Sequence, residues 1–168
     1  MVEHIIWFLS TAMVIVTVTL HYEVMTIVSD RIVPWAQRHV QMRRVVAFAI
    51  AGLMLGHITE IWVFAFIIKL LVYFPSFGSI QGDFSNRWED FLYLSAVNYT
   101  SLGDGDIRLI GPARAIAASE TLAGVMMIAW SASFTYLKME LIWERRRGYA
   151  KGELPPLPPN MPERRRTP

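Results

Sequence analysis

Apolar residues fill three long segments of this 168-residue chain, at positions 5–28, 45–73 and 113–137. The hydrocarbon core of a membrane, about 30 Å thick, is crossed by roughly 20 helical residues, so each segment is long enough to span it. The hydrophobic share of 54% also exceeds that of an average soluble domain. The sequence therefore predicts an all-α membrane protein with three transmembrane helices.

The first transmembrane helix, within residues 1–28, is expected to stay in the mature protein. Glu3 and His4 precede it where a secretory signal peptide carries basic residues, and it has no small-residue cleavage site. The chain contains no cysteine, which excludes disulfides, thiolate catalysis and thiolate metal sites.

Basic residues predict how the helices cross the membrane, because short cytoplasmic loops are rich in lysine and arginine. The linker at residues 29–44 carries four arginines against one aspartate. The tail at residues 139–168, counted together with Lys138, carries eight basic residues against four acidic ones. Residues 74–114 carry three basic and five acidic residues. We therefore expect the linker and the C-terminus in the cytoplasm and the N-terminus outside.

A short helix is predicted at residues 87–99, between the second and third transmembrane helices. Proline and glycine residues predict a loop before it, over residues 75–85. Asn86 and Glu89 have the spacing of a capping box at the helix start. The helix would be about 18 Å long, too short to cross a membrane and typical of a re-entrant segment.

A glycine-spaced segment follows this helix, and residues 100–106 have the sequence Thr-Ser-Leu-Gly-Asp-Gly-Asp. Spaced glycines allow unusual backbone conformations, so a row of carbonyl oxygens can point along one axis and replace the water shell of a cation. One chain cannot close a ring of such oxygens. Because the sequence has no internal repeat, the symmetry of a pore must come from several copies of the chain.

From about Gly56 to Leu137, the order of these features resembles the bacterial pore-loop potassium channel family, whose pore consists of two helices and a filter. The family pattern Thr-Thr-Val-Gly-Tyr-Gly-Asp aligns with Thr100, Ser101, Leu102, Gly103, Asp104, Gly105 and Asp106. Residues 56–62, 119–124 and 129–131 are similar to segments of small bacterial members that carry one extra N-terminal helix.

The resemblance implies a homotetramer in the bacterial inner, or plasma, membrane that conducts cations and is not an enzyme. It places the pore module at residues 45–138, with an outer helix at 45–73 and an inner helix at 113–137, on either side of the pore helix and filter. Carbonyl oxygens of Ser101, Leu102 and Gly103 would coordinate K⁺ or Na⁺, with the Ser101 hydroxyl innermost. No cofactor is implied.

Asp104 departs from the family pattern. Potassium-selective members have a tyrosine there that packs sideways and supports the outer filter, which an aspartate cannot do. The Gly-Asp-Gly filter resembles that of bacterial non-selective sodium and potassium channels, so we expect conduction of both ions, with a K⁺-selective channel as the alternative. Four copies of Asp104 and Asp106 would either bind Ca²⁺ at the outer mouth or remain screened rim charges.

Several ionisable residues lie within the predicted spans, where such groups are candidates for function, and three of them stand out. His57 and Glu60 share one face of the second helix, and Glu120 lies near the outer end of the third. They would act as pH sensors or brace the filter, and bracing is the interpretation we favour. Gly124 lies where related channels bend their inner helix, so it is either a gating hinge or a close-packing glycine.

The tail combines basic and proline residues. Arg145, Arg146 and Arg147 follow the last helix and would hold it against anionic lipids or set its topology. The proline-rich stretch that follows favours extended backbone, and we expect the tail to be disordered. No feature indicates nucleic-acid binding.

Two other classes of function remain open at this point. His21, His57 and Glu60 would serve as ligands or as acid and base in an intramembrane metal or redox enzyme. The chain would alternatively be a non-conducting subunit that supplies filter strands to a mixed channel.

Overall fold

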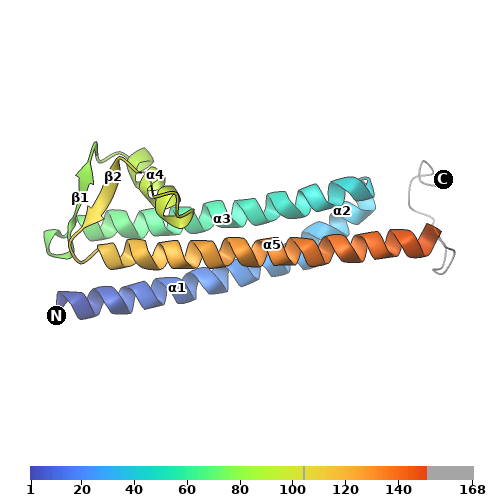
Figure 1. The fold of residues 1–168 in the computed structure, drawn as a ribbon, viewed down its shortest axis with the longest axis horizontal. Coiled ribbons are helices and arrows are strands. Elements are labelled where there is room, and N and C mark those ends of the chain that lie inside the picture. The colour runs from blue at the N-terminus through green and yellow to red at the C-terminus, as the bar shows by residue number, and fades with distance from the viewer. Residues whose placement is uncertain (104, 151–168) are drawn as a thin grey trace.

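Three long helices lie side by side and make the molecule elongated (Figure 1). The computed structural model describes residues 1–103 and 105–150. The long helices are α1 (Val2–Ile27), α3 (Met42–Val72) and α5 (Arg114–Ala150).

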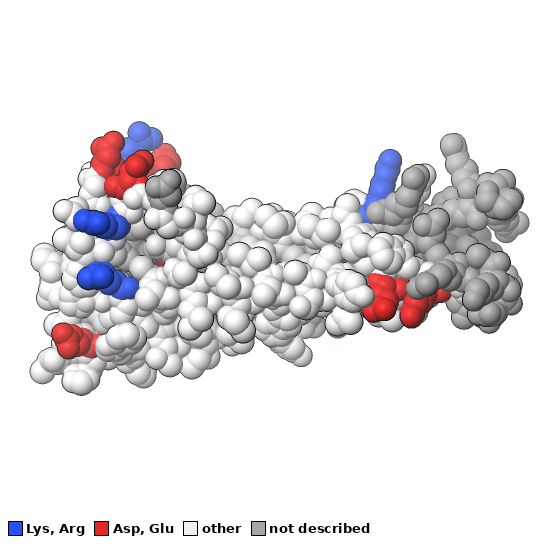
Figure 2. Space-filling model, in the orientation of Figure 1, with Lys and Arg blue, Asp and Glu red and all other residues white. Residues whose placement is uncertain are grey.

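Each long helix contains a segment apolar enough to cross a membrane. These segments are Val2–His39, Arg44–Val72 and Arg114–Leu141, with mean hydropathies of 1.8, 1.8 and 1.4. On the face drawn in Figure 2, the charged residues lie mainly toward the two ends of the molecule, and the middle is covered almost entirely by uncharged residues. The prediction of a mainly helical protein with three candidate membrane-crossing helices is confirmed.

The first helix continues beyond its predicted end. A π-helical turn, Val28–Ile32, joins α1 to the short helix α2 (Val33–His39). Pro34, in the first turn of α2, has no N–H to donate, and the wider turn before it absorbs this break in the hydrogen-bond ladder. Much of the expected linker at residues 29–44 is therefore helical.

A two-stranded antiparallel sheet lies at the end of the molecule that holds the N-terminus (Figure 1). Strand β1 (Ser79–Gly82) pairs with β2 (Ile107–Ile110), with Ser79 opposite Ile110 and Gly82 opposite Ile107. The prediction that residues 75–85 form a loop is wrong for β1. Each strand has only four residues, and the pairing that makes them strands joins segments more than twenty residues apart.

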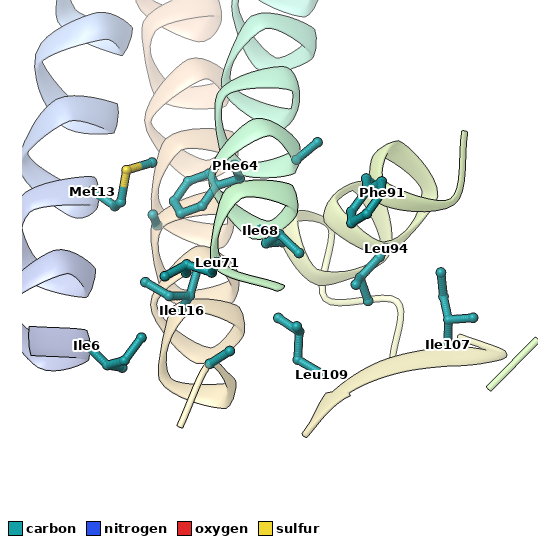
Figure 3. Close-up of a cluster of buried hydrophobic side chains, with 13 residues drawn as sticks. Ile6, Met13, Phe64, Ile68, Leu71, Phe91, Leu94, Ile107, Leu109 and Ile116 are labelled. Atoms are coloured by element: carbon teal, nitrogen blue, oxygen red, sulfur yellow. The ribbon is translucent and has the colours of Figure 1, made fainter. Parts of the chain in front are cut away.

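Helix α4 (Trp88–Tyr99) lies between these two strands in the chain and packs against α3 and α5. The core beside it holds apolar side chains from all three long helices, α4 and β2 (Figure 3). The labelled members are Ile6, Met13, Phe64, Ile68, Leu71, Phe91, Leu94, Ile107, Leu109 and Ile116. The core therefore fixes α4 against the half of the bundle that lies next to the sheet.

The start of α4 differs from the predicted capping box. Arg87 is the N-cap, and the Asp90 carboxylate accepts hydrogen bonds from the backbone N–H groups of Arg87 and Ser85, at 3.2 and 2.9 Å. Asn86 adopts a left-handed conformation, with φ 59°, and so precedes the cap. Asp90 thus replaces Glu89 as the acidic cap.

The last helix is longer than predicted. α5 continues to Ala150, so residues 139–150 of the expected disordered tail are helical. The proline-rich remainder, residues 151–168, and the side chains of Arg145, Arg146 and Arg147 lie outside the described part of the chain.

Candidate functional site

Helix α4 ends in a tight backbone turn that leads directly into the glycine-spaced segment. The N–H of Ser101 donates to the carbonyl of Asn98 at 3.0 Å, and the N–H of Leu102 donates to that of Val97 at 3.1 Å. This pair of bonds is a Schellman motif, in which the residue after the C-cap is left-handed and is commonly glycine. Here that residue is Ser101, with φ 53°.

Alternate residues of the segment adopt left-handed backbone conformations. Gly103 has φ +70°, two residues after Ser101. At Gly105, a Cβ atom would lie 3.2 Å from Val97 Cγ1 and 3.3 Å from the Ile107 carbonyl oxygen. Left-handed backbone is thus found at a serine and a glycine, and Gly105 permits close packing.

The segment has an open surface in the single chain. Thr100, Ser101, Leu102 and Gly103 are exposed, and the apolar side chain of Leu102 is 67% exposed. Asp106 is exposed as well. Asp104, on which the expected ion selectivity depends, lies outside the described residues, so the predicted acidic mouth is described only at Asp106.

Glu120 braces α4 from the inner helix α5. Its side chain is fully buried, and the Ser95 hydroxyl and the Asn98 amide of α4 lie 2.5 and 3.3 Å from its two carboxylate oxygens. The Ser95 hydroxyl also lies 2.8 Å from the carbonyl oxygen of Ile61 in α3. These contacts tie α4 to both neighbouring helices within two turns of the glycine-spaced segment.

His57 and Glu60 belong to a second buried polar cluster. The Tyr99 hydroxyl donates to Glu60 Oε2 and lies 2.8 Å from His57 Nδ1. His21 Nδ1 of α1 lies 2.9 Å from Glu60 Oε1, and the Ser131 hydroxyl of α5 lies 3.1 Å from His21 Nε2. Side chains from α1, α3, α4 and α5 thus meet in one cluster at the end of α4 that precedes the segment.

Four members of these clusters were missed from the sequence. They carry no distinctive motif, since single polar residues in an apolar helix are common, and they are Ser95, Asn98, Tyr99 and Ser131. The position of Tyr99 could have identified it, because it directly precedes Thr100 and its side chain must pack at the end of the short helix.

Gly124 lies against the end of α4. A Cβ atom on Gly124 would lie 2.0 Å from the carbonyl oxygen of Tyr99, far inside van der Waals contact. The absence of a side chain there lets α5 approach the backbone of the residue that precedes the segment. This geometry favours the close-packing alternative for Gly124.

Known proteins match the part of the chain that holds this site. Residues 56–139, half of the chain, match the model of a family described as ion channel. Protein LctB of Bacillus caldotenax is 38% identical over 79 residues, which cover 44% of this chain and 59% of that protein. Protein LctB of Geobacillus stearothermophilus is 41% identical over 58 residues, covering 34% and 43%. The chain thus spans less than two thirds of either relative, and no solved structure matches it.

Proposed function

We propose that this chain, which belongs to the ion channel family, conducts K⁺ and Na⁺ through a pore formed by four copies of it. The family is one of channels and not of enzymes, so the enzymatic alternative for His21, His57 and Glu60 is set aside. The observation that carries the proposal is the 12-residue helix α4, which ends at the glycine-spaced segment between two membrane-crossing helices. At about 18 Å it is too short to cross, so it enters the membrane and turns back.

The end of α4 favours a cation at the segment. The last carbonyl groups of a helix carry a partial negative charge, and those of α4 precede Thr100. The left-handed residues Ser101 and Gly103 alternate with Leu102, which turns successive carbonyl groups toward one side. We assign the coordination of dehydrated K⁺ or Na⁺ to the carbonyl oxygens of residues 101–103.

Several copies of the chain are needed to close this site. The exposed Leu102 side chain and the exposed backbone around it would be buried by neighbouring copies about a central axis. Four copies follow from the two-helix pore architecture to which the sequence is similar. The integral membrane protein would therefore be a homotetramer, with α1 packed outside the pore helices.

The charge distribution supports an orientation with the sheet outside. Arg31, Arg38 and Lys138 lie toward the end of the bundle opposite the sheet, with the α2 turn and the later part of α5. Basic residues favour the cytoplasmic face, so the N-terminus and β1–β2 would lie outside a bacterial inner membrane. Arg145, Arg146 and Arg147 would then face anionic lipids of the cytoplasmic leaflet.

Asp104 is the residue to which we assign weak selectivity. An aspartate between Gly103 and Gly105 cannot make the sideways apolar contacts that a tyrosine makes in a K⁺-selective filter. Four copies of Asp104 and Asp106 would also attract Ca²⁺ to the outer mouth, which predicts block by divalent ions.

Ion flux into liposomes that contain only this protein tests the proposal. Wild-type protein is expected to pass K⁺ and Na⁺ at similar rates, with inhibition by external Ca²⁺, and Asp104→Tyr is expected to favour K⁺. Asp83→Tyr is the matched control, because this acidic residue lies outside the segment and its change should alter neither rate. Flux of K⁺ alone through the wild type would refute the role of Asp104. No flux from a folded tetramer would favour a subunit that needs a partner.

A further inference from the structure

The cluster of His21, His57, Glu60 and Tyr99 is separate from the carbonyl oxygens assigned to ion coordination, and its chemistry differs from that of the filter. All four side chains are buried, at 0%, 8%, 1% and 1% exposure. Glu60 lies in a membrane-crossing helix, and its ion-pair partners among the described residues are the two histidines. A buried carboxylate at membrane depth is costly unless it is paired or coordinates a metal ion, and a metal ion held here would supply the positive charge.

We propose that His21, His57 and Glu60, with the Tyr99 hydroxyl as fourth ligand, form a binding site for Zn²⁺ or a similar transition metal ion. The side-chain donor atoms of the first three residues lie within 4.8 Å of one another. Glu60 oxygens lie 2.9 Å from His21 Nδ1 and 3.5 Å from His57 Nδ1. Two ligands of a tetrahedral zinc ion with bonds of about 2.0–2.1 Å are about 3.3 Å apart. The two Glu60–histidine distances are thus within 0.4 Å of this value, whereas a donor pair at the 4.8 Å limit would have to close by about 1.5 Å on binding.

The ligand types select the metal. Two imidazole nitrogens, a carboxylate and a phenol suit zinc and its neighbours, whereas Ca²⁺ and Mg²⁺ prefer oxygen ligands alone. The site is thus distinct in chemistry from the carbonyl oxygens assigned to K⁺ and Na⁺.

The Nε2 atom of His21, the ring nitrogen that would not bind the metal, has the hydrogen-bond partner that a metal-bound imidazole requires. With a metal on Nδ1, the neutral ring carries its proton on Nε2, where it can donate to the Ser131 hydroxyl at 3.1 Å.

A metal at this site would join elements that are otherwise held by packing. His21 lies in α1, His57 and Glu60 in α3, and Tyr99 at the end of α4, directly before Thr100. The ion would connect the first helix to the pore helix, so its binding should raise the melting temperature of the whole protein.

Metal binding to the purified full-length protein, with any histidine tag removed, tests this proposal without measuring ion flux. The probes are Zn²⁺, counted per chain after equilibrium dialysis, and Co²⁺, whose visible absorption reports tetrahedral nitrogen and oxygen ligands. We expect one ion per chain, a tetrahedral Co²⁺ spectrum, and a higher melting temperature with Zn²⁺. His21→Asn keeps a hydrogen-bond donor near the Nδ1 position and should abolish all three effects.

His39→Asn is the matched control, because His39 is exposed on α2 and its Nδ1 atom lies 2.8 Å from the Trp35 carbonyl oxygen, away from the cluster. This variant should bind as the wild type does. Ser131→Ala retains every ligand and should weaken Zn²⁺ binding by about 10–100-fold, which keeps the test valid if His21→Asn does not fold. Wild-type protein without stoichiometric metal, or binding that neither His21→Asn nor Ser131→Ala reduces, would overturn the proposal.

Discussion

Replacing Gly124 by alanine should destabilise the pore module, because the added methyl group has no space. Its Cβ atom would lie 2.0 Å from the Tyr99 carbonyl oxygen and 2.8 Å from the Tyr99 carbonyl carbon. Ordinary van der Waals contact begins near 3.4 Å, so the end of α4 must recede from α5 by about 1.4 Å. The atoms in contact are backbone atoms at the end of a helix, which cannot rotate away as a side chain can.

The size of the effect follows from two opposing contributions. Alanine favours the helix over glycine by about 1 kcal/mol, whereas overpacking a close contact costs about 1–3 kcal/mol and more where backbone must shift. Because the clash is with backbone, the cost lies at the upper end of this range, and we expect Gly124→Ala to lower the free energy of unfolding by about 2 kcal/mol. SDS titration of the protein in mixed micelles, followed by tryptophan fluorescence, measures this change.

Gly56→Ala is the matched control for this substitution. The nearest atom to its new Cβ would be Val24 Cγ1 at 2.6 Å, on a side chain that can change its rotamer. Its expected loss is therefore smaller, within about 1 kcal/mol of the wild type once helix propensity is counted.

Ion flux through the same variants separates packing from hinge motion at Gly124. The displaced carbonyl belongs to Tyr99, so the backbone of Thr100 and Ser101 must move with it, and flux should fall together with stability. Unchanged stability with altered flux would support a hinge and refute the packing argument. Equal losses in Gly124→Ala and Gly56→Ala would show that the Tyr99 contact is not the cause.

Three further substitutions test single contacts around α4. Glu120→Ala removes the acceptor of the Asn98 amide and one of the two acceptors near the Ser95 hydroxyl, and it should cost about 1–3 kcal/mol by the same titration, whereas Glu120→Gln should retain most of the stability. Lys69→Met removes a charge 3.8 Å from the Trp88 ring centroid and should cost about 0.5–1 kcal/mol, with a shift in tryptophan emission. The pKa of exposed Glu89 is lowered by its backbone hydrogen bond at the start of α4 and by Arg87. Its contribution to stability is thus present above its unfolded-state pKa and lost as pH falls, and Arg87→Gln should raise its pKa in an NMR titration.

The sequence was sufficient for features that depend on local pattern. Three apolar runs predicted the long helices, and the polar start and short length of residues 87–99 predicted α4 to within one residue. The prediction failed where distant segments decide the structure. Four-residue strands become strands only when Ile107–Ile110 pairs with Ser79–Gly82, and no local period indicates such a pairing.

Local rules also misplaced the cap of α4. Asn86 has the side chain of a good N-cap, but it takes the left-handed conformation that asparagine tolerates, and the helix begins after Arg87. The Asp90 carboxylate then accepts hydrogen bonds from the backbone N–H groups of Ser85 and Arg87, whereas a capping box at Asn86 would have used those of Asn86 and Glu89. The sequence thus offers two N-caps, Asn86 with Glu89 and Arg87 with Asp90, and the folded chain uses the second.

Candidate site residues were predicted individually and not as a group. His57 and Glu60 were recognisable because they are three residues apart on one helix. Their partners are 36–42 positions away in the sequence: His21 precedes them in α1, and Tyr99 follows them at the end of α4. Only the packing of α1 and α4 on opposite sides of α3 brings these side chains together.

Tyr99 is the residue at which the separate contacts of the pore module converge. Its hydroxyl group bonds to Glu60 and lies beside His57, its carbonyl oxygen lies against Gly124, and the chain continues from it into Thr100. A movement of α1 or α3 acts on the hydroxyl, a movement of α5 acts on the carbonyl, and both displace the start of the glycine-spaced segment. Tyr99→Phe removes only the first of these connections. It should therefore leave the close approach of α5 intact while it uncouples the segment from α1 and α3.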